Sequence, residues 1–271
     1  FWEKDRHMEA GLFDLFQDRN DLVVVSKLVD QWPFGTSRLG VDSAQWANID
    51  TYNYMVAEEG AEKGREVIHD LSRSIYFRGC ELLVTNDEKK MRRTSSKMLK
   101  QLKPVPEVLG LIRKFEARHG KLVNRIGVHI RTMSVRDEFK DFDPEREYGL
   151  ESMERMEYWR SKSSLETFAT EMRAQLEADP KATFFVSTDT PHVIGKLKEM
   201  FPGKVENMPL DQEQMCERKR DAACLRLALA DLLSLSRTKL FLGSNFSSFT
   251  SMVLKYGVKA WRRVGIEFAT E

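Results

Sequence analysis

The stretch "IGVHIRT", residues 126–132, decides how the second half of the chain folds. Three aliphatic residues alternate here with Gly127, His129 and Arg131, and a period of two is typical of a β-strand whose successive side chains point to opposite faces. One face of the predicted strand is therefore aliphatic, and the other carries His129 and Arg131. Two interpretations are open. Either the two polar side chains belong to a binding site, or the strand ends near Ile130, with His129 as a hydrogen-bonded core residue and Arg131 in solvent.

Composition describes a globular protein that is long enough for one large or two ordinary domains. The chain has 271 residues, of which 41% are hydrophobic. Its 43 Lys and Arg and 42 Asp and Glu nearly cancel, so no global charge indicates nucleic acid or an anionic membrane as a partner. We expect no nucleic-acid partner. No run approaches the roughly 18 apolar residues of a membrane span, and the opening "FWEKDRHMEAGLFDLF" resembles the end of a strand and its loop, so we expect the start of the fold to be missing.

The cysteines bear on metal binding and on disulfides. Cys80, Cys216 and Cys224 are too few and too scattered to predict a disulfide framework. No C-x-x-C or His/Cys cluster offers a zinc site, so we expect no structural metal. The odd number of cysteines does not decide the cellular compartment.

The first half of the chain mixes short apolar pieces with helical patterns, which predicts an α/β region with irregular loops. Its clearest helix is "VLGLIRKFEARHG", residues 108–120, with an apolar stripe at i, i+3, i+4 and i+7 and Gly120 as the expected stop. Residues 87–103 carry seven basic and two acidic side chains. We interpret them as a solvated helix face, with a phosphate-rich or acidic partner as the less favoured alternative.

From Val123 onward, strands alternate regularly with helices. Ser163 and Glu166 have the spacing of a capping box at the start of one predicted helix, and Thr190 is placed to cap the next, with Pro191 at its first position. This alternation predicts a parallel sheet that is covered on both faces. After the strand at 125–130, the predicted elements are a helix at 163–178, a strand at 182–188, a helix at 189–201, a short strand at 204–208, a helix ending at 236, a strand at 239–244 and a helix at 247–257.

Polar residues follow three of these strands. In an open parallel sheet, ligands bind at the carboxyl ends of the strands, where loops and helix starts meet. The first strand ends with His129 and Arg131, the second with residues 187–190, "STDT", and the third with residues 243–248, "GSNFSS", which open a helix. A turn of small, hydroxyl-bearing residues at a helix start is suited to phosphate, although such a turn is also common as an ordinary helix cap.

The combination of these three strand ends narrows the chemistry. An arginine, a carboxylate and a Ser/Asn-rich helix start can together bind a nucleoside diphosphate. The fingerprints G-x-G-x-x-G and G-x-x-x-x-G-K-[ST] are absent from the sequence, which excludes a dinucleotide enzyme of the usual kind and a P-loop NTPase. A G-x-S-x-G elbow is absent too, which disfavours an α/β-hydrolase. Nucleotide-sugar chemistry is the interpretation that remains.

The segments "IGVHIRT", "FFVSTDTP" and "DLLSLSRTKLFLGSNFSSFTSMV", in this order and spacing, resemble the fucosyltransferases of the α1,2/α1,6/protein-O-fucosyltransferase superfamily. The resemblance implies an α/β, GT-B-like fold, in which two Rossmann-like domains have parallel sheets flanked by helices. We then expect an acceptor-side domain at 1–122, a nucleotide-sugar-binding domain at 123–260 and a C-terminal tail at 261–271.

The same resemblance implies inverting transfer of fucose from GDP-fucose to a hydroxyl of a glycan or glycoprotein acceptor. No cofactor and no obligatory metal are expected, because Arg131 would contact the β-phosphate and stabilise the leaving GDP. His129 and Asp189 would help to hold the nucleoside. Ser247 and Ser248, with the backbone near Phe246, would bind the phosphates. The full set of donor-binding residues that the resemblance implies is His129, Arg131, Thr188, Asp189, Ser244, Asn245, Phe246, Ser247, Ser248 and Arg220.

Two features depart from the family pattern. Several relatives have a second arginine where this chain has Thr132, and Arg136 or Arg220 is a candidate to supply that charge. For the base that deprotonates the acceptor we choose Glu138 and then Asp137, which lie nearest the strand end in a charged run. Most charges of such a run are solvated.

Two alternatives to fucose transfer stay open from the sequence. One is a GT-B enzyme that uses another nucleotide sugar, and the other is a non-catalytic glycan- or nucleotide-binding relative. The compartment is open as well, with the Golgi lumen expected for a eukaryotic secretory enzyme and the cytoplasm for a bacterial or viral one. Asn245, Phe246 and Ser247 form a glycosylation sequon inside the proposed phosphate site, where a glycan would block binding.

Overall fold

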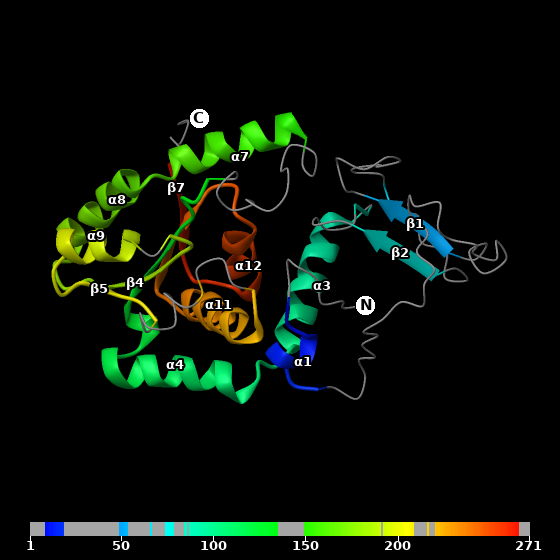
Figure 1. Cartoon of the computed structure of the whole chain (residues 1–271), viewed down its shortest axis with the longest axis horizontal. Coiled ribbons are helices and arrows are strands. Elements are labelled where there is room, and N and C mark those ends of the chain that lie inside the picture. The colour runs from blue at the N-terminus through cyan, green and yellow to red at the C-terminus, as the bar shows by residue number, and fades with distance from the viewer. Residues whose placement is uncertain are drawn as a thin grey trace.

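A five-stranded parallel sheet is the centre of the computed structural model, which describes residues 9–18, 49–53, 66, 74–78, 84–85, 87–134, 149–190, 192–208, 216 and 220–265. The strand order is β5-β4-β3-β6-β7, and every pairing is parallel (Figure 1). The strands are β3 (Ile126–Ile130), β4 (Phe184–Thr188), β5 (Val205–Glu206), β6 (Leu240–Ser244) and β7 (Trp261–Val264).

Helices connect and cover these strands. They are α4 (Pro106–His119), the 3₁₀ turn η1 (Leu122–Asn124), α7 (Leu150–Lys162), α8 (Leu165–Ala178), α9 (His192–Met200), α11 (Ala222–Leu235) and α12 (Ser248–Tyr256). Two shorter or more exposed helices, α1 (Leu12–Leu15) and α3 (Glu88–Gln101), precede them. No helix in the described ranges is long and apolar enough to span a membrane.

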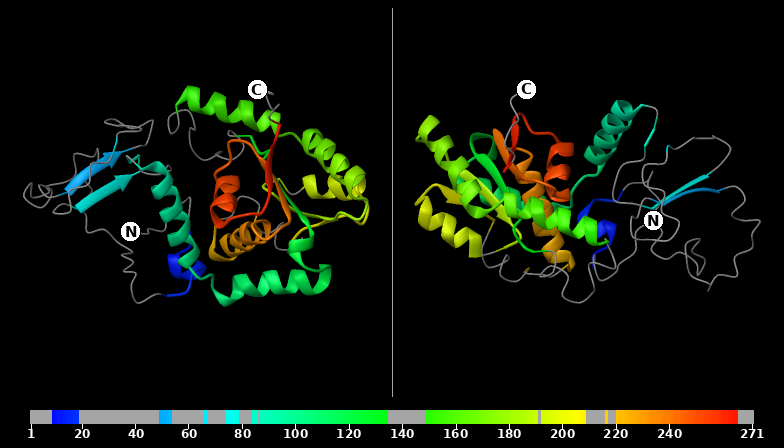
Figure 2. Two further views of the ribbon diagram at one scale, coloured as in Figure 1. Left: turned by 180° about the vertical axis from the view of Figure 1, so that it is seen from behind. Right: turned by 90° about the horizontal axis from the view of Figure 1, so that it is seen from above.

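The two faces of the sheet have separate cores. Ile126, Val128 and Ile130 pack with apolar residues of α8 and α9, and Leu242 and Val264 join them. The opposite face is covered by α4, α11 and α12, which pack around Phe185 and Phe241 (Figure 2). The predicted alternation along β3 is therefore confirmed, since its aliphatic side chains share one core.

Two glycines let helices approach the second face closely. A Cβ on Gly127 would lie 2.6 Å from Oγ1 of Thr238, just after α11, and a Cβ on Gly243 would lie 2.6 Å from Cγ2 of Thr250 in α12. Both distances are shorter than real Cβ contacts, so neither position has room for a side chain.

The elements predicted in residues 123–257 are all present, and the α/β class is confirmed. The helix predicted to end at Gly120 does so, with φ of 86° at that glycine. Helix α7 was not predicted, because its sequence "LESMERMEYWRSK" mixes charged and apolar residues and buries only Met153 and Arg160.

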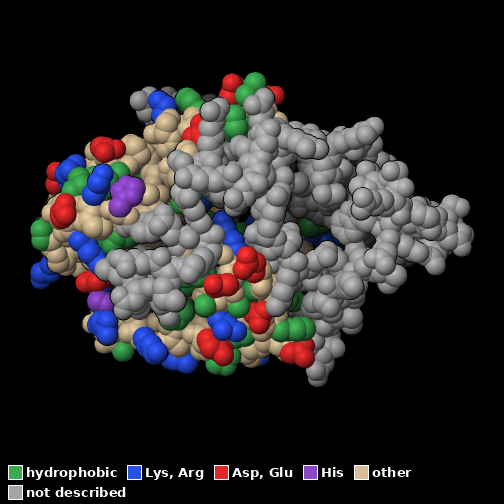
Figure 3. Space-filling model, viewed as in Figure 1, with side chains coloured by type: hydrophobic (Ala, Val, Ile, Leu, Met, Phe, Trp, Pro, Cys, Tyr) green, Lys and Arg blue, Asp and Glu red, His purple; other side chains and the backbone are tan. Residues whose placement is uncertain are grey.

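The chain ahead of the five-stranded sheet is described in part. The strands β1 (Ile49–Asn53) and β2 (Ser74–Arg78) form a parallel pair. The helix predicted in residues 87–103 is present as α3, and none of its residues is buried, which fits both a solvated face and a surface for an acidic partner. Charged side chains of both signs are interspersed over α4 at the bottom of the view (Figure 3). The described ranges hold one five-stranded sheet, so the pairing of two Rossmann-like domains in a GT-B fold stays a prediction.

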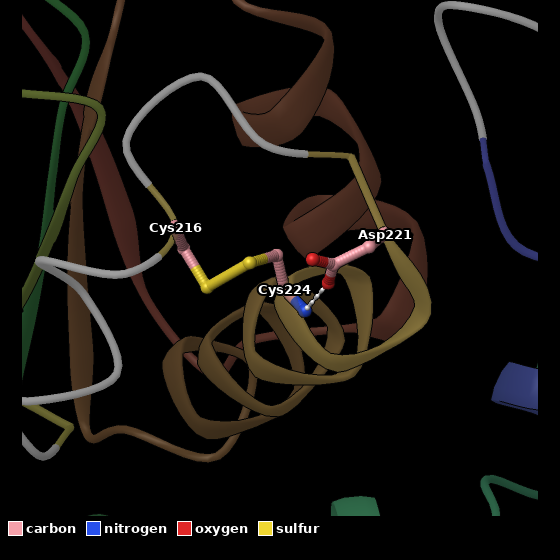
Figure 4. The surroundings of a disulfide bond; sticks show 3 residues. All are labelled: Cys216, Asp221 and Cys224. Atoms are coloured by element: carbon pink, nitrogen blue, oxygen red, sulfur yellow. Dashed lines mark hydrogen bonds between the residues drawn. A yellow bond between two sulfur atoms is a disulfide. The ribbon is translucent and has the colours of Figure 1, made fainter.

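Three expectations from the sequence need correction. Ser164, not Ser163, caps α8, because its Oγ accepts from the backbone N–H of Thr167 at 3.2 Å, whereas Ser163 ends α7 and is fully buried. The expected tail at 261–271 begins with β7, which pairs with β6 and extends the sheet. Cys216 and Cys224 form a disulfide beside the start of α11, where Asp221 caps the helix (Figure 4). The two cysteines are eight positions apart in the sequence.

Candidate functional site

The topology places a switch point of the strand order beside β3. From β3 the chain goes to β4 and β5 on one side, and it later returns to β6 and β7 on the other side. The order therefore reverses between β3 and β6, and such a switch point is where open α/β sheets bind ligands. The three strand ends that the sequence singled out are those of β3, β4 and β6, which are neighbours in the sheet.

An ion pair joins the ends of β3 and β4. Nη1 of Arg131 donates to Oδ2 of Asp189 at 2.7 Å, and the two side chains are 20% and 14% exposed. The same carboxylate accepts backbone N–H bonds from Thr132 at 3.1 Å and Met133 at 3.3 Å. Thr132 Oγ1 also donates to Thr190 Oγ1 at 3.1 Å. We call these contacts of residues 131–133 with residues 189–190 the β3–β4 seam.

Neutral hydrogen bonds join the ends of β3 and β6. The buried Ser244 Oγ donates to the carbonyl of His129 at 3.0 Å and accepts from the backbone N–H of Arg131 at 2.8 Å. Nδ1 of His129 lies 3.0 Å from Oγ1 of Thr250, and its ring stacks on Phe249 with centroids 4.6 Å apart. We call these contacts of residues 129–131 with residues 244, 249 and 250 the β3–β6 seam. It fastens the start of α12 to the centre of the sheet.

The ionisation of His129 follows from its burial. Desolvation, followed by the positive charge of Arg131, lowers the pKa of His129 from 6.5 to about 3. The imidazole is therefore neutral at physiological pH and acts as a hydrogen-bonded core residue. The alternative interpretation placed Arg131 in solvent, and this part of it is wrong. Asp189 holds the Arg131 side chain, which is largely buried, at the carboxyl ends of β3 and β4.

The start of α12 uses most of its polar side chains inside the fold. Ser247 caps the helix by accepting from the N–H of Thr250 at 3.3 Å. Asn245 is 2% exposed and donates through Nδ2 to the carbonyl of Val264 at 2.8 Å, so its amide is not accessible as a glycan acceptor in the folded chain. The backbone N–H groups of Ser248 and Phe249 have no partner among the described residues, and the side chain of Ser248 is exposed.

Helix α7 crosses the edge of the sheet where these strands end (Figure 1). Arg160 is buried and donates through Nη1 to the carbonyl of Met133 at 2.8 Å, which holds the segment that leaves β3. Ser163, at the end of α7, accepts from the N–H of Asn245 at 3.0 Å. The helix therefore ties the exit of β3 to the loop between β6 and α12. Helix α7 was not predicted from the sequence, and neither were the roles of Arg160 and Ser163.

The remaining predicted site residues fall in different places. Thr188 closes the turn after β4, since its Oγ1 accepts from the N–H of Thr190 at 3.1 Å. Arg220 precedes α11, and its carbonyl accepts from the N–H of Glu9 at 3.0 Å. Arg136, Asp137 and Glu138 lie outside the described residues. The structure thus brings together the residues at the ends of β3, β4 and β6 and puts Arg220 at another element.

Known proteins similar to this chain were found through structure alone. No protein-family model and no curated protein matches it. POFUT1 in complex with GDP is similar over 72% of this chain and 55% of its own, with TM-score 0.46 and 14% identity. NodZ α-1,6-fucosyltransferase soaked with GDP-fucose is similar over 70% and 54%, with TM-score 0.44 and 18% identity. Fucosyltransferase NodZ from Bradyrhizobium is similar over 69% and 53%, with TM-score 0.40 and 17% identity.

These neighbours are fucosyltransferases, the class of enzyme that the sequence motifs resemble. The chain spans about half the length of each of them.

Proposed function

We propose that this chain is a glycosyltransferase that binds GDP-fucose at the carboxyl ends of β3 and β6 and transfers fucose to a hydroxyl of a glycan or protein. One observation carries the proposal: Asp189 holds the guanidinium of Arg131 at the end of β3, which borders the switch point, and the backbone N–H of Arg131 bonds to Ser244 at the end of β6, ahead of α12. Arginine at such a point, next to a helix start, is suited to a diphosphate.

The diphosphate would be bound by two kinds of donor. A guanidinium presents five N–H groups in a planar fork, which matches the oxygens of a phosphate. The backbone N–H groups of Ser248 and Phe249 add donors at the positive end of the α12 dipole. The side chains of Ser244, Asn245 and Ser247 would contribute indirectly, because each is engaged in holding this backbone in place.

Catalysis would rest on stabilising the departing GDP. As the bond between the sugar and the β-phosphate breaks, negative charge grows on the phosphate oxygens, and a fixed cation lowers the energy of that transition state. Arg131 is the cation we assign to this role. Bonds to Arg131, Thr132 and Met133 engage both oxygens of Asp189, so we assign it to orienting Arg131 rather than to binding the nucleoside.

The acceptor hydroxyl needs a base. His129 is unsuited to that role, because its pKa of about 3 makes it a weak base and its Nδ1 is engaged with Thr250. Glu138, followed by Asp137, stays our proposal for the base. Neither step requires a metal ion in this scheme.

The experiment measures nucleotide binding and sugar transfer on the same protein. Calorimetry with GDP and UDP should give GDP-selective binding, and GDP-fucose with a panel of glycan acceptors should give transfer. Arg131→Ala should weaken GDP binding by about 10- to 100-fold, the loss expected for hydrogen bonds to a charged group, and should abolish transfer. Arg131→Lys should retain part of the binding, since the point charge remains but the fork is lost.

Arg118→Ala is the matched control, because Arg118 is exposed near the end of α4, which leads into the opposite edge of the sheet. Binding of UDP-sugars alone would contradict the fucose assignment. GDP binding without transfer to any acceptor would favour the non-catalytic alternative.

A further inference from the structure

Phe246 has an unusual backbone and an unusual exposure. Its φ is 48°, the one positive value found at a residue other than glycine in the described ranges. This conformation costs an L-residue about 1–2 kcal/mol, and for a bulky side chain it marks a true outlier. The ring is 49% exposed, so burial recovers only part of that cost. A contact between the exposed face of this ring and a ligand would explain why a phenylalanine, and not a glycine, occupies this position.

The fold holds the ring in place through the residues on either side. Asn245 is anchored by two hydrogen bonds, from its N–H to Ser163 Oγ and from its Nδ2 to the carbonyl of Val264. Ser247 is buried and caps α12. The guanidinium of Arg155, from α7, lies 5.3 Å from the ring centroid. Phe246 is thus presented at a rigid position, which is the property of a ligand contact rather than of a loose loop.

Phe246 directly precedes Ser247, the residue that caps α12. Arg131 and Asp189 span the ends of β3 and β4, whereas the neighbours of Phe246 bond to β7 and to the end of α7. A β-phosphate bound by Arg131 and by the backbone N–H groups at the start of α12 would therefore place the sugar that it carries next to the residue that precedes this helix start. The phenyl ring of Phe246 offers that sugar an apolar face.

We infer that the ring of Phe246 is the platform on which the hexose of the nucleotide sugar lies. This inference rests on the proposed function and names the sugar subsite of the same site. The C–H groups on one face of a hexose carry partial positive charge, and the face of an aromatic ring is negative, so the two surfaces attract each other as well as excluding water. A methyl group in place of a hydroxymethyl, as in fucose, strengthens the apolar contact.

Phe246→Gly tests the inference without risking the fold. Glycine adopts positive φ readily, so this change removes the ring and relieves the backbone. We expect its affinity for GDP-fucose to fall about five- to tenfold more than its affinity for GDP does, because only the sugar loses a stacked apolar contact. Phe246→Tyr keeps the aromatic face and should keep the GDP-fucose affinity. Phe13→Ala in α1, which removes another half-exposed ring, is the control and should change neither value.

The outcomes separate the two proposals. If the wild-type protein binds no GDP, the proposed function fails. If it binds GDP but Phe246→Gly weakens GDP and GDP-fucose equally, the ring contacts the nucleotide and the sugar platform is wrong. An unchanged affinity for both ligands would also overturn it. A selective loss for GDP-fucose, absent in Phe246→Tyr, supports it.

Discussion

The two seams of β3 both join the end of this strand to a neighbouring strand, but they do so with different chemical groups. The β3–β6 seam is buried and neutral: Ser244 and His129 are 1% and 4% exposed, and their partners are hydroxyl and backbone groups. The β3–β4 seam is partly exposed and charged, with Arg131 paired to Asp189. Arg131 belongs to both, through its backbone on one side and its side chain on the other.

The difference follows from the cost of burying charge. A charge that leaves water must be compensated fully, whereas a neutral hydroxyl or imidazole needs one good hydrogen bond. The β3–β6 seam is therefore built from neutral groups and fixes the position of α12. The β3–β4 seam keeps its charges within reach of solvent, where a phosphate can also bind the guanidinium of Arg131. In our proposal the first is a scaffold and the second is part of the site.

A substitution that disrupts the packing of α12 on β6 should cause the largest loss of stability. Gly243→Ala places a Cβ 2.6 Å from Cγ2 of Thr250 and 3.0 Å from the ring of Phe241, which pushes α12 away from β6. We expect the free energy of unfolding to fall by about 2–3 kcal/mol, as measured by urea denaturation. Adding Thr250→Ser removes the clashing methyl while keeping the hydroxyl that contacts His129, and should restore part of the loss.

Gly110→Ala is the control for that variant. Gly110 lies within α4 with nothing within 4 Å of the added Cβ, so alanine should stabilise the helix by about 0.5–1 kcal/mol. An equal loss of stability in both variants would show that close packing at Gly243 is not the cause.

The second largest effect on stability should come from low pH, which acts on His129 in the β3–β6 seam. The pKa of His129 is about 3 in the folded chain and near 6.5 when unfolded, so between these values the unfolded state binds the extra proton and stability falls as pH falls. From pH 7 to pH 5 this group alone should cost about 2 kcal/mol, as measured by urea denaturation at each pH. His129→Asn, whose amide can still contact Thr250, should lack this part of the pH dependence. An unchanged slope in the variant would contradict the assignment.

Substitutions in the β3–β4 seam should have the smallest effect on stability and the largest effect on fucose transfer. Asp189→Asn keeps an acceptor for one of the two backbone N–H groups and removes the charge that orients Arg131, so we expect a loss of about 1–2 kcal/mol in unfolding free energy. The difference from the wild type should shrink at high salt, because the pair is partly exposed. The rate of fucose transfer should fall more than GDP affinity does. A loss of stability larger than that of Gly243→Ala would refute the division into scaffold and site.

The alternating pattern of residues 126–130 was enough to predict the strand and its aliphatic face, and the alternation of strands with helices after Val123 was enough to predict the parallel sheet. The pattern could not show that His129 would be neutral and buried, since its partners, Thr250 and Phe249, lie about 120 residues away in the chain. Helix α7 escaped prediction because only Met153 and Arg160 are buried on it, too few for a period to be visible.

By itself, the sequence determined which residues would stand at the strand ends, because chain connectivity in an alternating α/β fold puts all carboxyl ends of parallel strands at one edge. Only the tertiary structure decided what each of them does there. Asn245 and Ser244 turn inward to bond backbone groups, Asp189 is taken by Arg131, and Phe246 is held outward at positive φ. The physical reason is that a hydrogen bond or an exposed ring depends on distances between segments far apart in the chain, and no local pattern encodes those distances.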